Sequence, residues 1–291
     1  MKYETKIDIV STDGIIKYDN CAKKIFSNKE IMAVILKNVV NEYKELSLSE
    51  IENIIDADTI SSEDCLLDVN EVKIKGIGTE MSDITEKLIR YDLHFKSRIP
   101  KSKKHLHIDF EIQNETNPNT LNYDIEDRAI YYAAREISSQ LSTVTKNTNY
   151  GKLEKVYTIW VCNNNVPAKK QHTIVRLSYK NSKISNLIQG IIIYRGKKQY
   201  NDTGEYDELF EFLDGIFKND IAIIEKYVTN CNEKIRKDIT EMDGLAQTIR
   251  EKSKIEILIE LVNEKHITEE IACEKLNVSK EEFKNLMETS K

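Results

Sequence analysis

Two stretches of alternating polar and apolar residues, separated by a short basic turn, lie between Tyr91 and Asn114 and constrain the fold more than any other feature. In the first stretch, the apolar residues Tyr91, Leu93 and Phe95 alternate with Asp92, His94 and Lys96. In the second, Leu106, Ile108, Phe110 and Ile112 alternate with His107, Asp109, Glu111 and Gln113. Alternation with a period of two gives a strand one apolar and one polar face, and Pro100 with the polar run 101–104 interrupts it. The sequence therefore predicts a β-hairpin.

The polar face of this hairpin gathers acidic residues. If the hairpin closes symmetrically about Lys101–Ser102, Asp92 falls opposite or next to Glu111. Glu111 and Gln113 are two residues apart, so they point to the same face about 7 Å apart along the strand. Asp109 is a further candidate for this face. Two adjacent carboxylates repel each other unless a cation lies between them, and Mg²⁺ or Mn²⁺ suits such oxygen ligands. We expect Asp92 and Glu111 to bind the metal.

Histidines offer a second type of ligand in the same stretch. His105 and His107 occupy alternate positions and would suit a transition metal. No third histidine lies at ligand spacing, however, and the carboxylates favour a harder ion. The other interpretations of His94 and His107 are phosphate contact or a simple place on the polar face of the strand.

The segments YDLHF, IDFEIQN, DRAIYY and KVYTIWVC together resemble the PD-(D/E)XK nuclease superfamily. More closely, the chain resembles the PD-(D/E)XK nuclease family transposases, which are related to recombination-promoting nucleases. The resemblance covers about residues 15–215. In the superfamily, Asp and Glu bind the metal and a third residue, usually Lys, helps to position the water. Here Gln113 stands in the place of that Lys, as it does in the transposase-like group.

The resemblance implies a metal-dependent DNA endonuclease that hydrolyses phosphodiester bonds in transposase-like or recombination-promoting reactions. It implies catalytic roles for Asp92, Glu111 and Gln113, with Mg²⁺ or Mn²⁺ as cofactor. Glu80, which follows Thr79 after a Gly-containing loop, matches a family element, and Arg128 matches an Arg before paired tyrosines. The alternative is a catalytically degenerate relative that binds DNA or a protein partner through the same fold. A third reading is an unrelated metal-binding or structural protein.

The order of expected elements predicts the fold. Helices, the hairpin, a helix at 125–141 and strands at 155–162, 173–179 and 187–194 indicate an α/β protein. The resemblance implies a restriction-endonuclease-like three-layer core with a mixed central sheet, in a nuclease-like domain of residues 1–218. Residues 219–291 are expected to form a helical C-terminal tail that ends in a helix-turn-helix pattern, which suits packing or oligomerisation better than DNA reading. Capping boxes are expected at Ser27–Glu30 and Ser47–Glu50.

Composition limits the partners and the compartment. The chain has 291 residues, 40% hydrophobic and 32% charged, no signal-peptide core and no run long enough to span a membrane. Its five cysteines include no CxxC pair, which fits a reduced cytoplasm. A net charge of −6 does not favour binding to nucleic acid, but affinity for phosphate depends more on local clusters of Lys and Arg than on the total charge. These are Lys96, Arg98, Lys101, Lys103 and Lys104 in the hairpin, expected beside the acidic site, and later Lys169, Lys170, Lys180, Lys183, Arg195, Lys197 and Lys198. We expect DNA as the partner and no membrane, and we leave a homodimer open.

Overall fold

The chain forms two compact units in a computed structural model. The model describes residues 12–56, 80–81, 89–90, 92–143, 149–177, 187–199, 203–229 and 231–289. One unit comprises Ala22–Ile239, and the described part of the other holds residues 12–21 and 240–289. None of the helices in these ranges combines the length and the apolar character that a membrane span requires.

A mixed five-stranded sheet forms the centre of the larger unit. Its strands are β3 (Leu93–Arg98), β4 (His105–Gln113), β5 (Lys155–Cys162), β6 (Thr173–Leu177) and β7 (Ile188–Tyr194), in the order β3-β4-β5-β7-β6. Strands β4, β5 and β7 run parallel, whereas β3 and β6 pair antiparallel at the two edges. A separate two-stranded sheet is formed by β1 (Glu80–Met81) and β2 (Ile89–Arg90). The predicted mixed sheet is confirmed.

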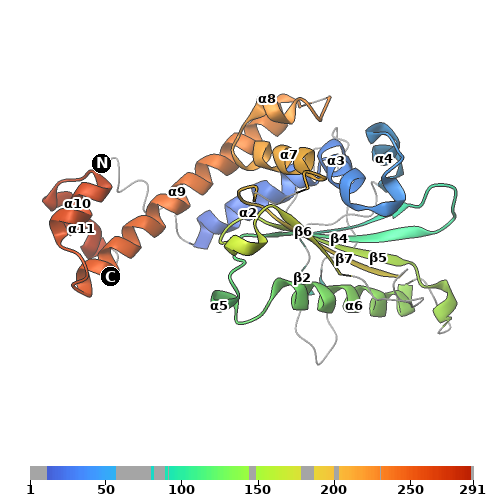
Figure 1. Ribbon diagram of the computed structural model, residues 1–291, viewed down its shortest axis with the longest axis horizontal. Coiled ribbons are helices and arrows are strands. Elements are labelled where there is room, and N and C mark those ends of the chain that lie inside the picture. The colour runs from blue at the N-terminus through green and yellow to red at the C-terminus, as the bar shows by residue number, and fades with distance from the viewer. Residues whose placement is uncertain are drawn as a thin grey trace. The chain divides into compact units, whose positions relative to one another are not determined.

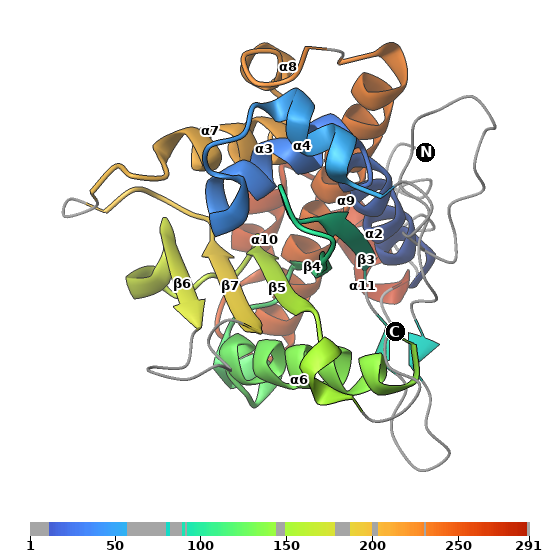
Figure 2. The ribbon, with the colours of Figure 1, turned by 90° about the vertical axis from the view of Figure 1, so that its right-hand side faces the viewer.

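Helices cover both faces of this sheet (Figure 1). Helix α6 (Ile125–Thr143) connects β4 to β5 and lies along one face, while α3 (Lys29–Val39), α4 (Leu48–Ile54) and α7 (Asp207–Phe217) lie on the other (Figure 2). On the second face, the Phe26 ring at the end of α2 (Thr12–Phe26) lies 5.3 Å from Phe110 and 5.7 Å from Phe217, measured between centroids. These three layers are those of the predicted restriction-endonuclease-like α/β core.

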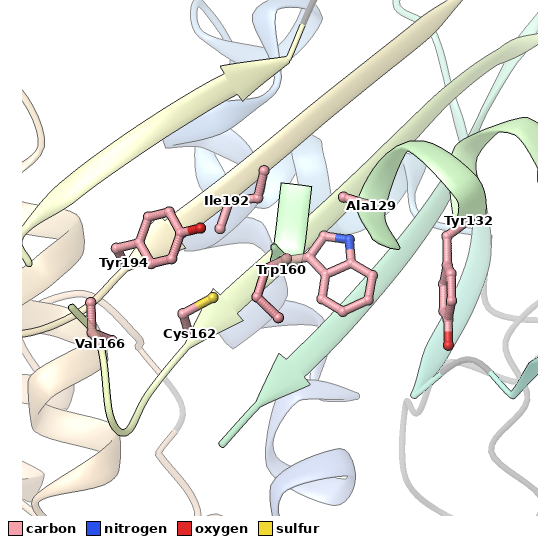
Figure 3. Close-up of a cluster of buried hydrophobic side chains, with 8 residues drawn as sticks. Ala129, Tyr132, Trp160, Cys162, Val166, Ile192 and Tyr194 are labelled. Carbon is pink, nitrogen blue, oxygen red and sulfur yellow. The ribbon is translucent and has the colours of Figure 1, made fainter. Parts of the chain in front are cut away.

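The apolar part of the α6 face is built around Trp160. Figure 3 shows its indole between Tyr132 of α6 and Cys162 of β5, with Tyr194 beyond. The Tyr132 ring meets the indole edge-on at a centroid distance of 5.2 Å, and Trp160 is fully buried. Trp160 is therefore a packing residue, which fixes how α6 lies on β5 and β7.

Helix α6 buries a different face from the one that its apolar residues predict. The apolar residues of α6 predict a stripe of Ile130, Ala133, Ala134, Ile137 and Leu141, yet Ile130 is 44% exposed and Ala134 is exposed, while Ala133 is buried. The buried positions include Glu136 and Gln140. Paired tyrosines were likewise expected inside, but Tyr131 is 48% exposed while Tyr132 is buried. The predicted stripe is therefore only partly buried, because Glu136 of α6 turns toward the polar side chains His94 of β3 and His107 of β4.

The first helices also differ from the prediction. Residues from Thr12 are helical, and the chain passes from α2 to α3 at Ser27–Asn28. Asn28 caps α3 by accepting hydrogen bonds from the backbone N–H groups of Glu30 and Ile31. Ser27, the predicted cap, ends α2 instead and donates its hydroxyl to the Lys24 carbonyl. The Ser47–Glu50 capping box of α4 is confirmed.

The remaining elements are helical. They are η2 (Asn41–Tyr43), α5 (Pro118–Leu121), η3 (Tyr150–Lys152), η4 (Ala168–Lys170), α8 (Ile221–Ile224), α9 (Glu233–Asn263), α10 (Glu269–Leu276) and α11 (Lys280–Thr289). Thr268 caps α10, Ser279 caps α11, and Asn277 between them has a positive φ of 55°. The two helices share an apolar cluster with the end of α9 around Phe283. The predicted helical C-terminal region is confirmed.

Candidate active site

The hairpin register places Asp92 beside Glu111. The turn is centred on Lys101–Ser102, because Arg98 pairs with His105 and Leu93 pairs with Phe110. Asp92 and Glu111 follow directly beyond this last pair. Their two segments exchange hydrogen bonds: the Asp92 N–H donates to Glu111 Oε1 at 3.0 Å, and the Ile112 N–H donates to Asp92 Oδ2 at 2.9 Å. Each carboxylate is thus held through one oxygen by the backbone of the opposite strand.

The second Asp92 oxygen faces a cation. Lys23 Nζ, near the end of α2, lies 3.3 Å from Asp92 Oδ1, and both side chains are 24% exposed. This ammonium offsets part of the negative charge at the edge of the acidic cluster. The sequence analysis assigned Lys23 no place at the site.

A third carboxylate completes the cluster. Asp109 lies two residues before Glu111 on the same face of β4, and it is 1% exposed. Its Oδ2 accepts a hydrogen bond of 2.9 Å from the Thr158 hydroxyl, and Thr158 in turn accepts one of 2.7 Å from the Trp160 indole N–H. Its Oδ1 is buried and has no hydrogen-bond partner within the described ranges. An uncompensated acceptor at this depth favours a cation or a proton nearby.

The electrostatics of the cluster agree with this geometry. Burial raises the pKa of Glu111 well above its ordinary range, and the charges of Asp92 and Asp109 raise it further. The pKa of Asp109 is raised in the same way, because burial outweighs the hydrogen bond from Thr158. Three oxygen-donor side chains therefore converge, and among the described residues Lys23 and Arg128 offset only part of their negative charge. This donor set fits a hard divalent ion.

Gln113 and Arg128 form a second, adjoining unit. The Arg128 guanidinium donates from Nη1 to Gln113 Oε1 at 3.3 Å and from Nη2 to the Tyr132 hydroxyl at 2.8 Å. It also lies over the aromatic rings of Tyr132 and Trp160, 5.1 and 5.2 Å from their centroids. The Gln113 amide nitrogen donates to the Glu115 carbonyl at 2.7 Å. Both side chains are held in place, and the Arg128 charge acts on Glu111 and lowers its pKa against the larger effect of burial.

The family model of the PD-(D/E)XK nuclease family transposases matches residues 68–256 of the chain. The chain belongs to this family. No curated protein and no solved structure matches the chain in the corresponding comparisons. Membership in the PD-(D/E)XK family indicates a nuclease-like or transposase-like function on nucleic acids, and proteins of this superfamily generally use divalent metals. The acidic cluster provides oxygen donors for such an ion.

One residue that the PD-(D/E)XK pattern suggested lies in another sheet. Glu80 is in β1, where it pairs with Arg90 of β2, and not in the five-stranded sheet that carries Asp92 and Glu111. Thr79, the other half of the predicted Thr-Glu element, lies outside the described residues. A catalytic role for Glu80 therefore stays a prediction.

The basic hairpin turn does not lie beside the acidic site of this PD-(D/E)XK protein. Six residues separate Asp92 from Arg98, which corresponds to about 20 Å along an extended strand. The prediction that the basic turn lies beside the acidic site was wrong, because Asp92 stands at one end of β3 and the basic turn follows the other end. Among the later basic residues, several are paired with carboxylates: Lys170 with Glu126, Arg195 with Asp214 and Lys198 with Asp207. The cations at the acidic cluster are Lys23 and Arg128.

The sequence prediction missed a polar stripe of α6. Arg128, Tyr132, Glu136 and Gln140 recur every four residues, and this spacing places them on one side of a helix. Tyr132, Glu136 and Gln140 are buried, and Arg128 reaches Gln113. The four-residue spacing is visible in the sequence, but apolar residues alone do not reveal it, because every member of the stripe is polar.

Proposed function

We propose that this protein is a metal-dependent DNA endonuclease of the transposase-like or recombination-promoting kind, with Asp92 and Glu111 as ligands of Mg²⁺ or Mn²⁺. The observation that carries the proposal is the reciprocal pair of backbone hydrogen bonds that holds the two carboxylates side by side. A bound divalent ion supplies Lewis-acid activation of a phosphodiester and of the attacking water. Asp109, with its unpartnered buried oxygen, adds negative charge directly behind the pair.

In this protein, Gln113 and Arg128 together take the place of the Lys that most PD-(D/E)XK nucleases carry at the third catalytic position. An amide does not titrate, so Gln113 neither carries positive charge nor acts as a charged base. It orients the attacking water and holds Arg128 through Oε1. Arg128 supplies the positive charge near the developing charge on the scissile phosphate, and its contacts with Tyr132 and Trp160 fix its direction. Glu80 is an additional candidate for positioning the water.

We also propose that the catalytic part corresponds to residues 1–218 and that residues 219–291 form a helical tail. The tail contains α8 to α11. Helix α11 carries the acidic residues Glu281 and Glu282 in its first turn, which does not favour contact with phosphate. The tail therefore suits packing or dimerisation better than DNA reading.

Plasmid cleavage with Mg²⁺ or Mn²⁺ tests the catalytic proposal. We expect the natural protein to cleave and Asp92→Ala to lose cleavage by more than about 100-fold, since this change removes an anchored ligand. Asp127→Asn is a matched control because Asp127 is an exposed carboxylate next to Arg128. This control should cleave at the natural rate.

Variants at Gln113 separate an enzyme from a degenerate relative. Gln113→Ala should slow cleavage and leave Mg²⁺ binding largely intact, whereas Asp92→Ala should lose both. Gln113→Lys alone brings a second cation against Arg128, so the informative variant is Gln113→Lys with Arg128→Gln, which should recover activity relative to Arg128→Gln alone. A protein that binds DNA but is inert with both metals, in natural and double-variant form, is a degenerate relative. Cleavage by Asp92→Ala at the natural rate would refute the assigned site.

A further inference from the structure

A second group of ligand-type side chains lies one step further along the polar face of the hairpin. His94 of β3, His107 of β4 and Glu136 of α6 each offer one donor atom, and these atoms all lie within 4.8 Å of one another. The His107 Nδ1 to Glu136 Oε1 distance is 2.7 Å, and the His94 Nε2 to Glu136 Oε1 distance is 3.2 Å.

All three side chains are enclosed. His94 is 5% exposed, and His107 and Glu136 are each 2% exposed. Glu136 Oε2 is buried and has no hydrogen-bond partner within the described part of the chain. Helix α6 buries this carboxylate, whereas its apolar residue Ile130 is exposed. A carboxylate with an unsatisfied oxygen is costly at this depth unless a cation compensates it.

The two nitrogens of His107 face different groups. Nδ1 points to the shared centre with Glu136, and Nε2 lies 3.0 Å from Glu154 Oε2. Glu154 is itself held, because its Oε1 accepts from the His105 N–H at 3.0 Å and its backbone N–H donates to Gln140 Oε1 at 2.8 Å. A histidine that binds a metal through one nitrogen typically donates its other N–H group to a carboxylate, which fixes the ring and its tautomer. His107 and Glu154 have this arrangement.

The centre combines two imidazole nitrogens with one carboxylate. Zn²⁺ takes such donors at about 2.0–2.2 Å in a tetrahedral arrangement, so that ligand atoms lie about 3.3 Å apart. The three donor atoms, all within 4.8 Å of one another, lie near this spacing.

We propose that His94, His107 and Glu136 bind a transition-metal ion, with Zn²⁺ as the best fit, in a site separate from the acidic cluster. Two imidazoles distinguish this site from the all-oxygen cluster, which suits Mg²⁺. Asp109 pairs with His94 in the sheet register and lies between the two sites. The ion would link β3, β4 and α6 directly beneath Asp92 and Glu111, as a structural ion that water does not reach. The site does not depend on the proposed nuclease activity.

Spectroscopy of the full-length protein tests this assignment without variants. After chelation and dialysis, one equivalent of Zn²⁺ is added and its X-ray absorption spectrum is recorded. The expected spectrum contains the scattering of two imidazole rings at about 2.0–2.1 Å and no sulfur ligand. A Zn²⁺ spectrum without imidazole scattering overturns the proposal, as does failure of the protein to retain Zn²⁺ at micromolar concentration.

Variants then locate the ion. In the background Asp92→Asn with Glu111→Gln, which removes the competing acidic site, Zn²⁺ affinity should be unchanged. His94→Gln and Glu136→Gln preserve polarity and size, and each should weaken Zn²⁺ binding by more than about 100-fold, while Glu154→Gln should weaken it by about 10–100-fold. Circular dichroism of each variant establishes that it is folded.

His105→Gln is the matched control for these variants. His105 belongs to the same strand, but its ring is half-buried and it faces Glu154 and not the shared centre. Zn²⁺ affinity should be retained in this variant. Equal losses in His105→Gln and His94→Gln, or natural affinity in a folded His94→Gln, would place the ion elsewhere.

Discussion

Replacing Glu111 with Gln should stabilise the metal-free protein. Glu111 is buried between Asp92 and Asp109, and its pKa is raised by burial and by these two charges. The new amide keeps an oxygen that accepts the Asp92 N–H, now 3.0 Å from Glu111 Oε1, and its N–H group can donate to the unpartnered Asp109 oxygen. Removing the carboxylate therefore removes repulsion without breaking the hairpin contact.

The size of the effect follows from the local charges. Two like charges about 4 Å apart repel by about 4 kcal/mol at an effective dielectric constant of about 20. Lys23 and Arg128 offset part of this repulsion, so we expect a net gain in the free energy of unfolding of about 1–2 kcal/mol at pH 7. In a protein of this size, each kcal/mol of added stability raises the Tm by about 2–4 °C.

The dependence on pH and on metal makes the prediction specific. The pKa of Glu111 is higher in the folded protein than its ordinary value of 4.5. The ionisation of Glu111 therefore lowers the free energy of unfolding once the pH rises above that ordinary value. The advantage of Glu111→Gln should therefore be absent below about pH 4 and should grow as the pH rises from there to 7. With Mg²⁺ at 100 times its Kd, the natural protein gains about 2.7 kcal/mol, which should reverse the order of stability.

Urea unfolding followed by circular dichroism, with EDTA or with Mg²⁺ and at both pH values, measures these differences. Glu205→Gln, which removes an exposed carboxylate, should leave stability unchanged under all four conditions. If Glu111→Gln is less stable than the natural protein at pH 7 in EDTA, the acidic cluster is not repulsive and the reasoning fails.

Two further predictions concern parts of the fold that position the sheet. Glu42 accepts hydrogen bonds of 2.7 Å from Lys155 and from the Tyr157 hydroxyl, and these outweigh burial to lower its pKa. Glu42→Gln should cost about 1–2 kcal/mol in urea unfolding at pH 7, and the deficit should shrink as the pH falls below about 4; an undiminished deficit at pH 3 contradicts the charge argument. Asn28→Ala should cost about 1 kcal/mol through loss of the α3 cap, and an unchanged midpoint would show that the cap is dispensable.

The hairpin was predictable from the sequence because its register has one solution. Period-two alternation fixes which face each residue takes, and a short turn fixes which residues pair. Asp92 and Glu111 could therefore be brought together before the fold was known. The dense strand Lys155–Cys162 was equally clear, since a run of β-branched and aromatic residues indicates a central parallel strand.

The surroundings of the polar face could not be predicted in the same way. A half-polar edge hairpin normally exposes that face to water, so the sequence left His94 and His107 as phosphate contacts or as residues on the polar face of their strands. In the structure α6 covers this face, and both histidines are buried. Which side of a helix is buried depends on the chemistry of the surface beneath it. The Glu136 and Gln140 positions therefore become meaningful only once α6 is known to lie over polar strands.

The hydrogen-bonded series from Trp160 through Thr158 to Asp109 connects the single tryptophan of the chain to the acidic cluster. The fluorescence emission of an indole depends on the charge near its N–H group, which here is that of Asp109, reached through Thr158. The protein thus carries an internal fluorophore next to its candidate catalytic carboxylates, and it is shielded from solvent by Tyr132. A metal bound at the acidic cluster, as proposed above, or a change in the protonation of Asp109 should therefore alter the emission of Trp160 in the unlabelled protein, without a substrate.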